Sequence, residues 1–160
     1  GEIAEFLEEM KLVTVRIRSE VVSEERHKNW RGAAGARVTA PVDLFYGVDL
    51  KHLGNGAVQP SLTNPRHLKI TVPAPRLQAV EVFARDEEIA VQTSGLRFRT
   101  RAGEYYLGLA RRKLHECARR RALLPEQIER VMATTRRQIR KLAETFTGDD
   151  YEITVVFRNG

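Results

Sequence analysis

Apolar residues occupy every second position of residues 36–50, and this alternation is the clearest structural signal in the chain. The residues that share the apolar face are Ala36, Val38, Ala40, Val42, Leu44, Tyr46 and Val48. Arg37, Thr39, Asp43 and Asp49 take the other face, as expected of a strand with one side against a core. Pro41 has no N–H to donate, so the pattern predicts a sheet edge or a bulge there.

Shorter alternating segments predict the other strands. They are residues 11–22, 67–72, 77–83 and 151–157, with a turn and a further short strand over residues 86–94. Pro73 and Pro75 lie between two of these segments, and we expect them to mark a kink or a bulge.

The segments between the strands are interpreted from their composition. Residues 23–35 are polar and then small, so we expect a long connection, with Trp30 anchoring it on the core. Asp49 is a good N-cap for a helical turn over residues 50–53, which gives it a structural rather than a catalytic role.

Three segments have helical spacing of their apolar residues. Residues 2–10 form a short amphipathic helix with an acidic first turn. Residues 103–122 place an apolar stripe that includes Ala110, Leu114 and Cys117 opposite basic residues, and a second long helix begins at Pro125 and ends near Phe146.

The order of these elements predicts an α+β fold. We expect a single mixed or mostly antiparallel sheet, with a long C-terminal helical pair packed on one face and a final strand returning to that sheet. At 160 residues the chain fits a single domain, residues 1–160. Within it we expect a helix over 2–10, mainly strands over 11–100, two helices over 103–146 and the last strand over 151–158.

The charge of the chain is unevenly distributed. Its net charge is +6. Residues 97–141 hold 14 Lys or Arg and 4 Glu, a balance of +10, so the remainder is −4. We predict an anion-binding surface from the cations that lie opposite the apolar stripes, namely Arg112, Arg119, Arg130, Arg137 and Lys141. The alternative is that these side chains only keep the helices solvated.

No residue pattern specifies a metal, a cofactor or a reaction. The four histidines, His27, His52, His67 and His115, lack a partner at ligand spacing, and we expect Cys117 to be a small core residue. Asp43 and Asp49 would lie about 20 Å apart on a strand, too far for a pair of glycosidase carboxylates. We therefore expect no metal and no cofactor, and the sequence favours a non-enzymatic protein.

Several short motifs, taken in order, resemble a known family. They are LVTVRIRSEVV at residues 12–22, GVDL at residues 47–50, VPAP at residues 72–75 and VEV at residues 80–82. In this order, and followed by two helices and a terminal strand, they are similar to the bacterial Domain of Unknown Function 4230 family over residues 12–157.

The resemblance implies a location but no chemistry. It implies that residues 2–10 form a juxtamembrane helix after one N-terminal membrane helix, and a start at Gly1 rather than Met agrees with that expectation. A membrane-tethered and extracytoplasmic domain is therefore expected. The family has no established activity, cofactor or catalytic residue to carry over, and the arginine density of the two long helices departs from its pattern.

Three classes of function stay open from the sequence. The leading one is a non-enzymatic domain of a membrane-anchored bacterial protein that binds a protein partner or an anionic membrane surface. The second is a nucleic-acid-binding domain that uses the basic helices. The third is an enzyme whose site is assembled from dispersed residues.

Overall fold

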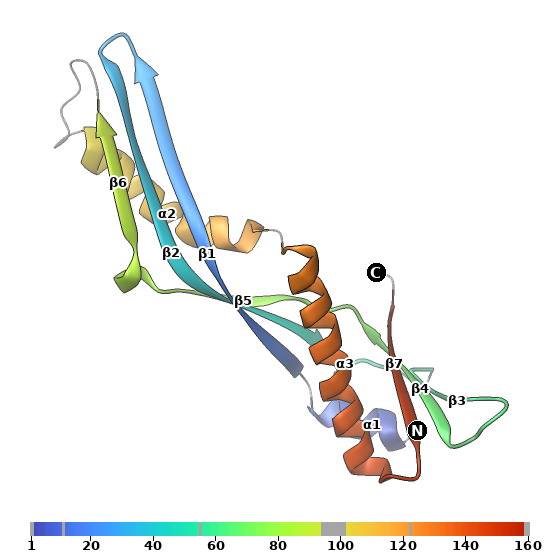
Figure 1. The fold of residues 1–160 in the computed structure, drawn as a ribbon. Coiled ribbons are helices and arrows are strands. Elements are labelled where there is room, and N and C mark those ends of the chain that lie inside the picture. The colour runs from blue at the N-terminus through green and yellow to red at the C-terminus, as the bar shows by residue number, and fades with distance from the viewer. Residues whose placement is uncertain (1, 11, 55, 94–101, 122, 159–160) are drawn as a thin grey trace. The chain divides into compact units, whose positions relative to one another are not determined.

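The computed structural model describes residues 2–10, 12–54, 56–93, 102–121 and 123–158. Its elements, in chain order and as labelled in Figure 1, are α1 (Glu2–Met10), β1 (Leu12–Asn29), β2 (Gly32–Asp49), β3 (Val58–Pro60), β4 (His67–Pro73), β5 (Arg76–Val82), η1 (Ala84–Asp86), β6 (Glu88–Thr93), α2 (Glu104–Arg120), α3 (Pro125–Thr147) and β7 (Glu152–Arg158). The chain, which we expected to be one domain, divides into two compact units. Unit 1 contains residues 1–16, 45–78 and 123–160, and unit 2 contains residues 17–44 and 79–122.

The alternation predicted for β2 is confirmed. Its apolar face is buried at Ala36, Val38, Ala40, Val42, Leu44 and Val48, and Tyr46 is half-buried. β2 has β1 as one neighbour and pairs with β5 and β6 as well, so it is not an edge strand. At Pro41 the irregularity lies in the partner strand. The ladder with β6 ends at Thr39 opposite Glu88, η1 precedes Glu88 in the chain, and the Phe83 N–H before η1 donates to the Pro41 carbonyl at 2.9 Å.

The long connection expected over residues 23–35 is wrong, because β1 and β2 extend through it as a hairpin. Ser23 and Ala34 are buried on the covered face, so this stretch still has one side against the core. The turn itself contains Trp30 and Arg31, and Gly32 follows with a φ of 125°, a value that favours glycine. Trp30 does not anchor anything on the core, since its side chain is 82% exposed.

Asp43 lies on the polar face of β2, as predicted, and yet it is buried. Arg18 on β1 covers it with two hydrogen bonds, Nε to Oδ1 at 2.9 Å and Nη2 to Oδ2 at 3.2 Å. The Arg18 guanidinium also lies 4.9 Å from the ring centroid of Phe83. The hydrogen bond and charge of Asp43 raise the pKa of Arg18 above its ordinary value. The buried Asp43 carboxylate is therefore neutralised by the guanidinium of Arg18, which donates to both of its oxygens.

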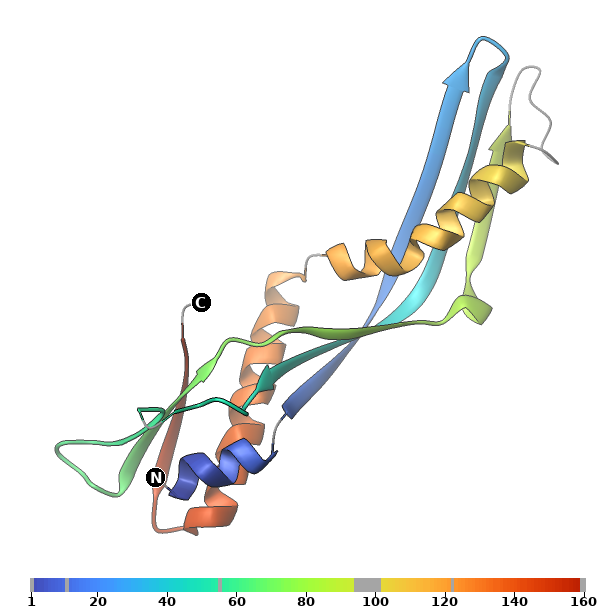
Figure 2. The same cartoon turned by 180° about the vertical axis from the view of Figure 1, so that it is seen from behind.

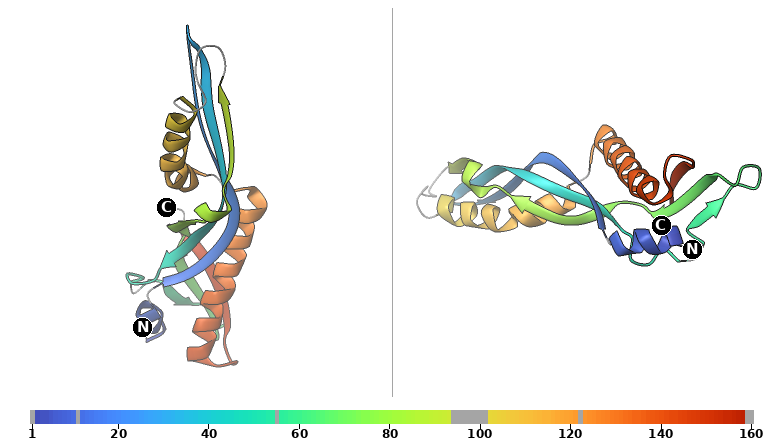
Figure 3. Two further views of the ribbon diagram at one scale, coloured as in Figure 1. Left: turned by 90° about the vertical axis from the view of Figure 1, so that its left-hand side faces the viewer. Right: turned by 90° about the horizontal axis from the view of Figure 1, so that it is seen from below.

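In unit 2, helix α2 lies over one face of the hairpin (Figure 3). Its Ala110, Leu114 and Ala118 are buried, which confirms most of the predicted stripe, and Cys117 is half-buried. Lys113 pairs with Glu25 of β1 at 2.6 Å, and the Tyr106 ring stacks on His27. Odd-numbered residues near the end of β1 thus face the helix, and the even-numbered residues lie on the opposite, open face.

Unit 1 contains a separate three-stranded sheet in the order β3-β4-β7. β4 pairs antiparallel with β3 and parallel with β7, with Ile70 opposite Val155. Helix α3 lies against β7 and α1 (Figure 2), and it buries Val131, Thr135, Ile139 and Ala143. Pro125 at its start and Gly148 at its end take the predicted places.

The α+β class and the returning last strand are confirmed, whereas the single sheet is wrong. The last strand joins the sheet of β3 and β4, not that of β1 and β2. Pro73 and Pro75 offer a physical reason, because neither can donate to a ladder where β4 gives way to β5. The C-terminal helix pair is present, with α2 in unit 2 and α3 in unit 1.

We predict that Val42→Asp unfolds unit 2. Val42 is fully buried on β2, and an unpaired charge there costs several kcal/mol against a total of roughly 5 to 15 kcal/mol. Thermal melting followed by circular dichroism measures this. Arg37→Asp, at an exposed position of the same strand, is the matched control and should melt within a few degrees of the unmodified chain. A Val42→Asp chain that melts cooperatively near the original temperature would contradict the assignment of Val42 to the buried face of β2.

Candidate functional site

The five cations predicted from the sequence are all exposed, but they belong to two units. Arg112 and Arg119 lie on α2 in unit 2, and Arg130, Arg137 and Lys141 lie on α3 in unit 1. None of them forms an ion pair with a residue that the structure describes. Whether they bind an anion stays a prediction.

Other cations of the basic segment are neutralised by carboxylates. Arg111 pairs with Glu87 at 2.6 Å, and Arg120 with Glu116 at 2.6 Å. The hydrogen bond and charge of Glu25 raise the pKa of Lys113 above its ordinary value. Two of these three carboxylates lie outside residues 97–141, so the balance of +10 overstates the charge of the helices. Arg97, Arg99 and Arg101, which also enter that balance, lie outside the described residues.

The end of α3 contributes to a cavity of about 740 Å³ in which both signs of charge meet. Its cations are Arg66, Arg137, Arg140 and Lys141, and its carboxylates are Glu144, Asp149, Asp150 and Glu152. Four charges of each sign leave the cavity with no net charge to attract an anion. This cavity is therefore a weaker anion site than the segment charge indicated.

A more one-sided surface lies at the turn end of the β1–β2 hairpin, which sequence reasoning missed. Residues 26–42 contain four cations and no Asp or Glu, a local charge of +4. We name Arg26, Lys28, Arg31 and Arg37 the hairpin cation cluster. Lys28, Arg31 and Arg37 are exposed and form no ion pair with any described residue. The signal was in the sequence, as a stretch of 17 residues without a carboxylate, but it was missed because residues 23–35 were interpreted as a connection and only residues 36–42 as part of a strand.

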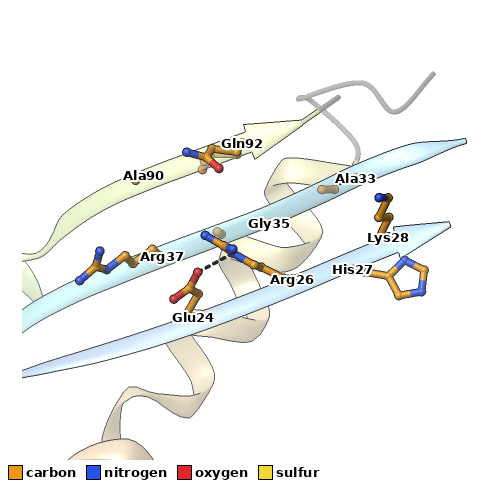
Figure 4. Close-up of a pocket in the computed structure, with 12 residues that line it drawn as sticks. Glu24, Arg26, His27, Lys28, Ala33, Gly35, Arg37, Ala90 and Gln92 are labelled. Carbon is orange, nitrogen blue, oxygen red and sulfur yellow. Dashed lines mark ion pairs between the residues drawn. The ribbon is translucent and has the colours of Figure 1, made fainter. Parts of the chain in front are cut away.

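Three of these cations line a cavity of about 990 Å³ on the open face (Figure 4). Small residues, Ala33, Gly35 and Ala90, form part of its lining, and Gln92 of β6 adds an amide. Figure 4 shows Arg26 and Arg37 on neighbouring strands, with the Arg26 side chain lying beside Gly35. Small residues between long cationic ones make a depression bordered by hydrogen-bond donors.

Gly35 has a specific role in this arrangement. A Cβ at this position would lie 3.0 Å from the Glu25 carbonyl oxygen and 3.1 Å from Cγ of Arg26. The glycine therefore lets the Arg26 side chain lie close over β2. Glu24 holds the other end of that side chain, with Oε1 2.5 Å from Arg26 Nε. Arg26 is thus positioned and partly neutralised, whereas Lys28 and Arg37 remain available.

The turn adds an aromatic side chain to the cations. Asn29 Oδ1 accepts a hydrogen bond from the Arg31 backbone N–H at 2.9 Å, which fixes the turn. The Arg31 guanidinium lies 5.0 Å from the ring centroid of Trp30. An exposed indole with a stacked guanidinium therefore marks the end of the hairpin.

Residues considered for chemistry are not gathered into a site. His67 Nε2 lies 2.8 Å from Thr154 Oγ1, and among the described residues no group of three or more His, Cys, Asp or Glu could hold a metal. Asp49 has the structural role predicted for it: Oδ1 accepts the Lys51 N–H at 2.9 Å, although the segment forms a turn rather than a helical turn.

Comparisons with known proteins identify no relative. No family model matches the chain, and neither a curated protein nor a solved structure matches it. The resemblance to the Domain of Unknown Function 4230 family thus stays a prediction. Among the described residues, no helix has the length and apolar character needed to cross a bilayer.

We predict that folding needs no metal ion. Adding EDTA should leave the melting temperature unchanged, because the described residues offer no ligand set. Differential scanning calorimetry with and without EDTA, followed by addition of Zn²⁺, provides the measurement. A fall of several degrees in EDTA that Zn²⁺ restores would overturn this expectation.

Proposed function

We propose that this chain is a non-enzymatic binding module that attaches to an anionic membrane surface through the open face and turn of the β1–β2 hairpin. The observation that carries the proposal is the absence of any carboxylate from residues 26–42, where Lys28, Arg31 and Arg37 are exposed and form no ion pair with the part of the chain that the structure describes. These cations are free to contact phosphate groups without first breaking an internal ion pair.

The chemistry of the cluster favours binding over catalysis. Guanidinium groups bind phosphate through paired N–H donors, and an ammonium binds it as a point charge. Arg26, Arg37 and Gln92 present donors from three adjacent strands around small residues. Such a set attracts and holds anions and contributes neither a nucleophile nor a general base.

The magnitude expected of this surface is modest. Each cation close to an anionic lipid surface contributes about 1 kcal/mol, so the three unpaired cations together give about 3 kcal/mol at low salt. That contribution decreases as salt shortens the Debye length to about 8 Å at physiological ionic strength. The surface therefore needs a tether or a second contact for stable attachment. The membrane helix implied by the family resemblance would supply one, and we include it in the proposal together with an extracytoplasmic location.

We predict that Lys28→Gln/Arg31→Gln/Arg37→Gln reduces binding to phosphatidylserine vesicles by about 100-fold at low salt. The matched control is Arg130→Gln/Arg137→Gln/Lys141→Gln, which also removes three exposed cations without an ion-pair partner in the described ranges and lowers the net charge by three. Vesicle sedimentation at low and at physiological salt measures both, and melting temperatures check that each variant folds.

The control also tests the prediction made from the sequence. If the α3 variant loses binding and the hairpin variant does not, the helix cations carry the function and the hairpin proposal is wrong. Duplex DNA in place of vesicles separates the second class of function, because DNA binding retained at physiological salt, without vesicle binding, would identify a nucleic-acid-binding domain. If both variants bind vesicles and DNA as well as the unmodified chain does, the hairpin surface and the helix cations are both wrongly assigned.

A further inference from the structure

The strongest unexplained feature of the surface is Trp30. It is the only tryptophan in the chain, and its side chain is 82% exposed. A large apolar ring in water is unfavourable, and tryptophan normally buries most of its area. The Arg31 guanidinium, 5.0 Å from the ring centroid of Trp30, leaves most of the indole in water, whereas the Tyr106 ring of unit 2 stacks on His27. Burial of the Trp30 ring therefore requires a partner other than the residues that the structure describes.

The backbone holds Trp30 away from the sheet. The turn joins two strands of 18 residues each, and it is fixed by the hydrogen bond from the Arg31 N–H to Asn29 Oδ1. In Figures 1 and 2 the turn lies beyond the end of β6 and beyond the first turn of α2. No described element of unit 2 covers the indole, and the hairpin presents it at its end.

We propose that Trp30 inserts at the headgroup level of an anionic lipid bilayer, and that Lys28 and Arg31 contact lipid phosphates beside it. This inference rests on the proposed function and names its partner and its penetrating residue. Tryptophan is favoured at membrane–water interfaces, where its ring is apolar and its N–H still finds an acceptor. Lys and Arg next to it keep their charged ends at the phosphates while their stems lie along the apolar surface.

The positions of the cations agree with attachment to a plane. Lys28 and Arg31 lie within two residues of Trp30, and Arg37 lies about 20 Å farther along β2 by strand geometry. Arg26, Lys28 and Arg37 all line the cavity on the open face. If the hairpin is tilted so that its open face is turned toward a bilayer, all four residues of the hairpin cation cluster lie near the headgroups. Trp30, at the turn, then enters the bilayer first.

The same positions disfavour nucleic acid as the occupant. Proteins that bind single strands stack bases on aromatic side chains set among the cations of a groove. His27 is the only residue with a ring among those that line the cavity, and its ring is turned to the helix, where it stacks on Tyr106. The indole lies at the turn and beyond the cation-lined depression, which suits insertion into a surface rather than stacking along a strand.

Because the chain has one tryptophan, its intrinsic fluorescence reports on Trp30 without a label. On binding to vesicles of phosphatidylcholine with phosphatidylserine, we expect the emission to move to shorter wavelength and to be quenched by lipids with brominated acyl chains. Vesicles of phosphatidylcholine alone should produce neither change. Emission that stays unshifted and unquenched while sedimentation shows the chain bound would overturn the insertion of Trp30, although the electrostatic proposal would survive.

Variants separate this inference from the proposed function. Trp30→Ala should weaken phosphatidylserine vesicle binding by at least about tenfold, and it should leave binding to soluble polyphosphate unchanged. Lys28→Gln/Arg31→Gln/Arg37→Gln should weaken both. Leu62→Ala, which removes a fully exposed apolar side chain from a loop of unit 1, is the control and should change neither. Equal vesicle binding by Trp30→Ala and the unmodified chain would contradict the inference, and absence of vesicle binding at low salt would contradict both.

Discussion

Burial of one face of β2 is the constraint on which the rest of unit 2 depends. Val38 and Val42 are fully buried there, and the smaller residues Ala34, Ala36 and Ala40 are buried beside them. The buried residues of α2 include two that are also small, Ala110 and Ala118. Because side chains alternate between the two faces of a strand, covering one face with α2 places Arg37 and Gly35 on the other. The open face of the hairpin is therefore a direct consequence of how the core is packed.

The sequence predicts those parts of the fold in which periodicity and backbone chemistry agree. The strand at residues 36–50, the first helix, the start of α3 at Pro125 and its end at Gly148 all have a local cause that can be identified in the sequence. The hairpin end could not be predicted in this way. Near residues 23–35 the covered face uses Ser23 and Ala34 instead of large apolar residues, so a strand has the composition of a loop. The division into two sheets depends on long-range pairing, which local periodicity does not specify.

The candidate site was missed for a related reason. Charge was summed along the sequence, which groups Lys113 and Arg111 with their helix. Folding instead places each beside a carboxylate from another element, Glu25 for Lys113 and Glu87 for Arg111. Pairing of this kind removes apparent excess charge from α2. In the hairpin cation cluster Arg26 pairs with Glu24, while Lys28, Arg31 and Arg37 have no ion-pair partner among the described residues. The net charge of a sequence segment thus indicates whether a partner is anionic or cationic, but it does not locate the binding surface.

Along β1, ion pairing of the cations decreases from Arg18 toward the turn. Arg18 is held by both oxygens of a buried carboxylate, and Arg26 by one oxygen of the exposed Glu24, whereas Lys28 and Arg31 near the turn have no acidic partner among the described residues. An unpaired surface cation is well hydrated and costs the fold little, so its lack of a partner does not by itself require a ligand. Exposure of Trp30 is different, because apolar area in water carries a cost that only burial removes. Weak electrostatic attraction can bring such a hairpin to many anionic surfaces. Burial of the indole selects, among these surfaces, one with an apolar interior, such as a lipid bilayer.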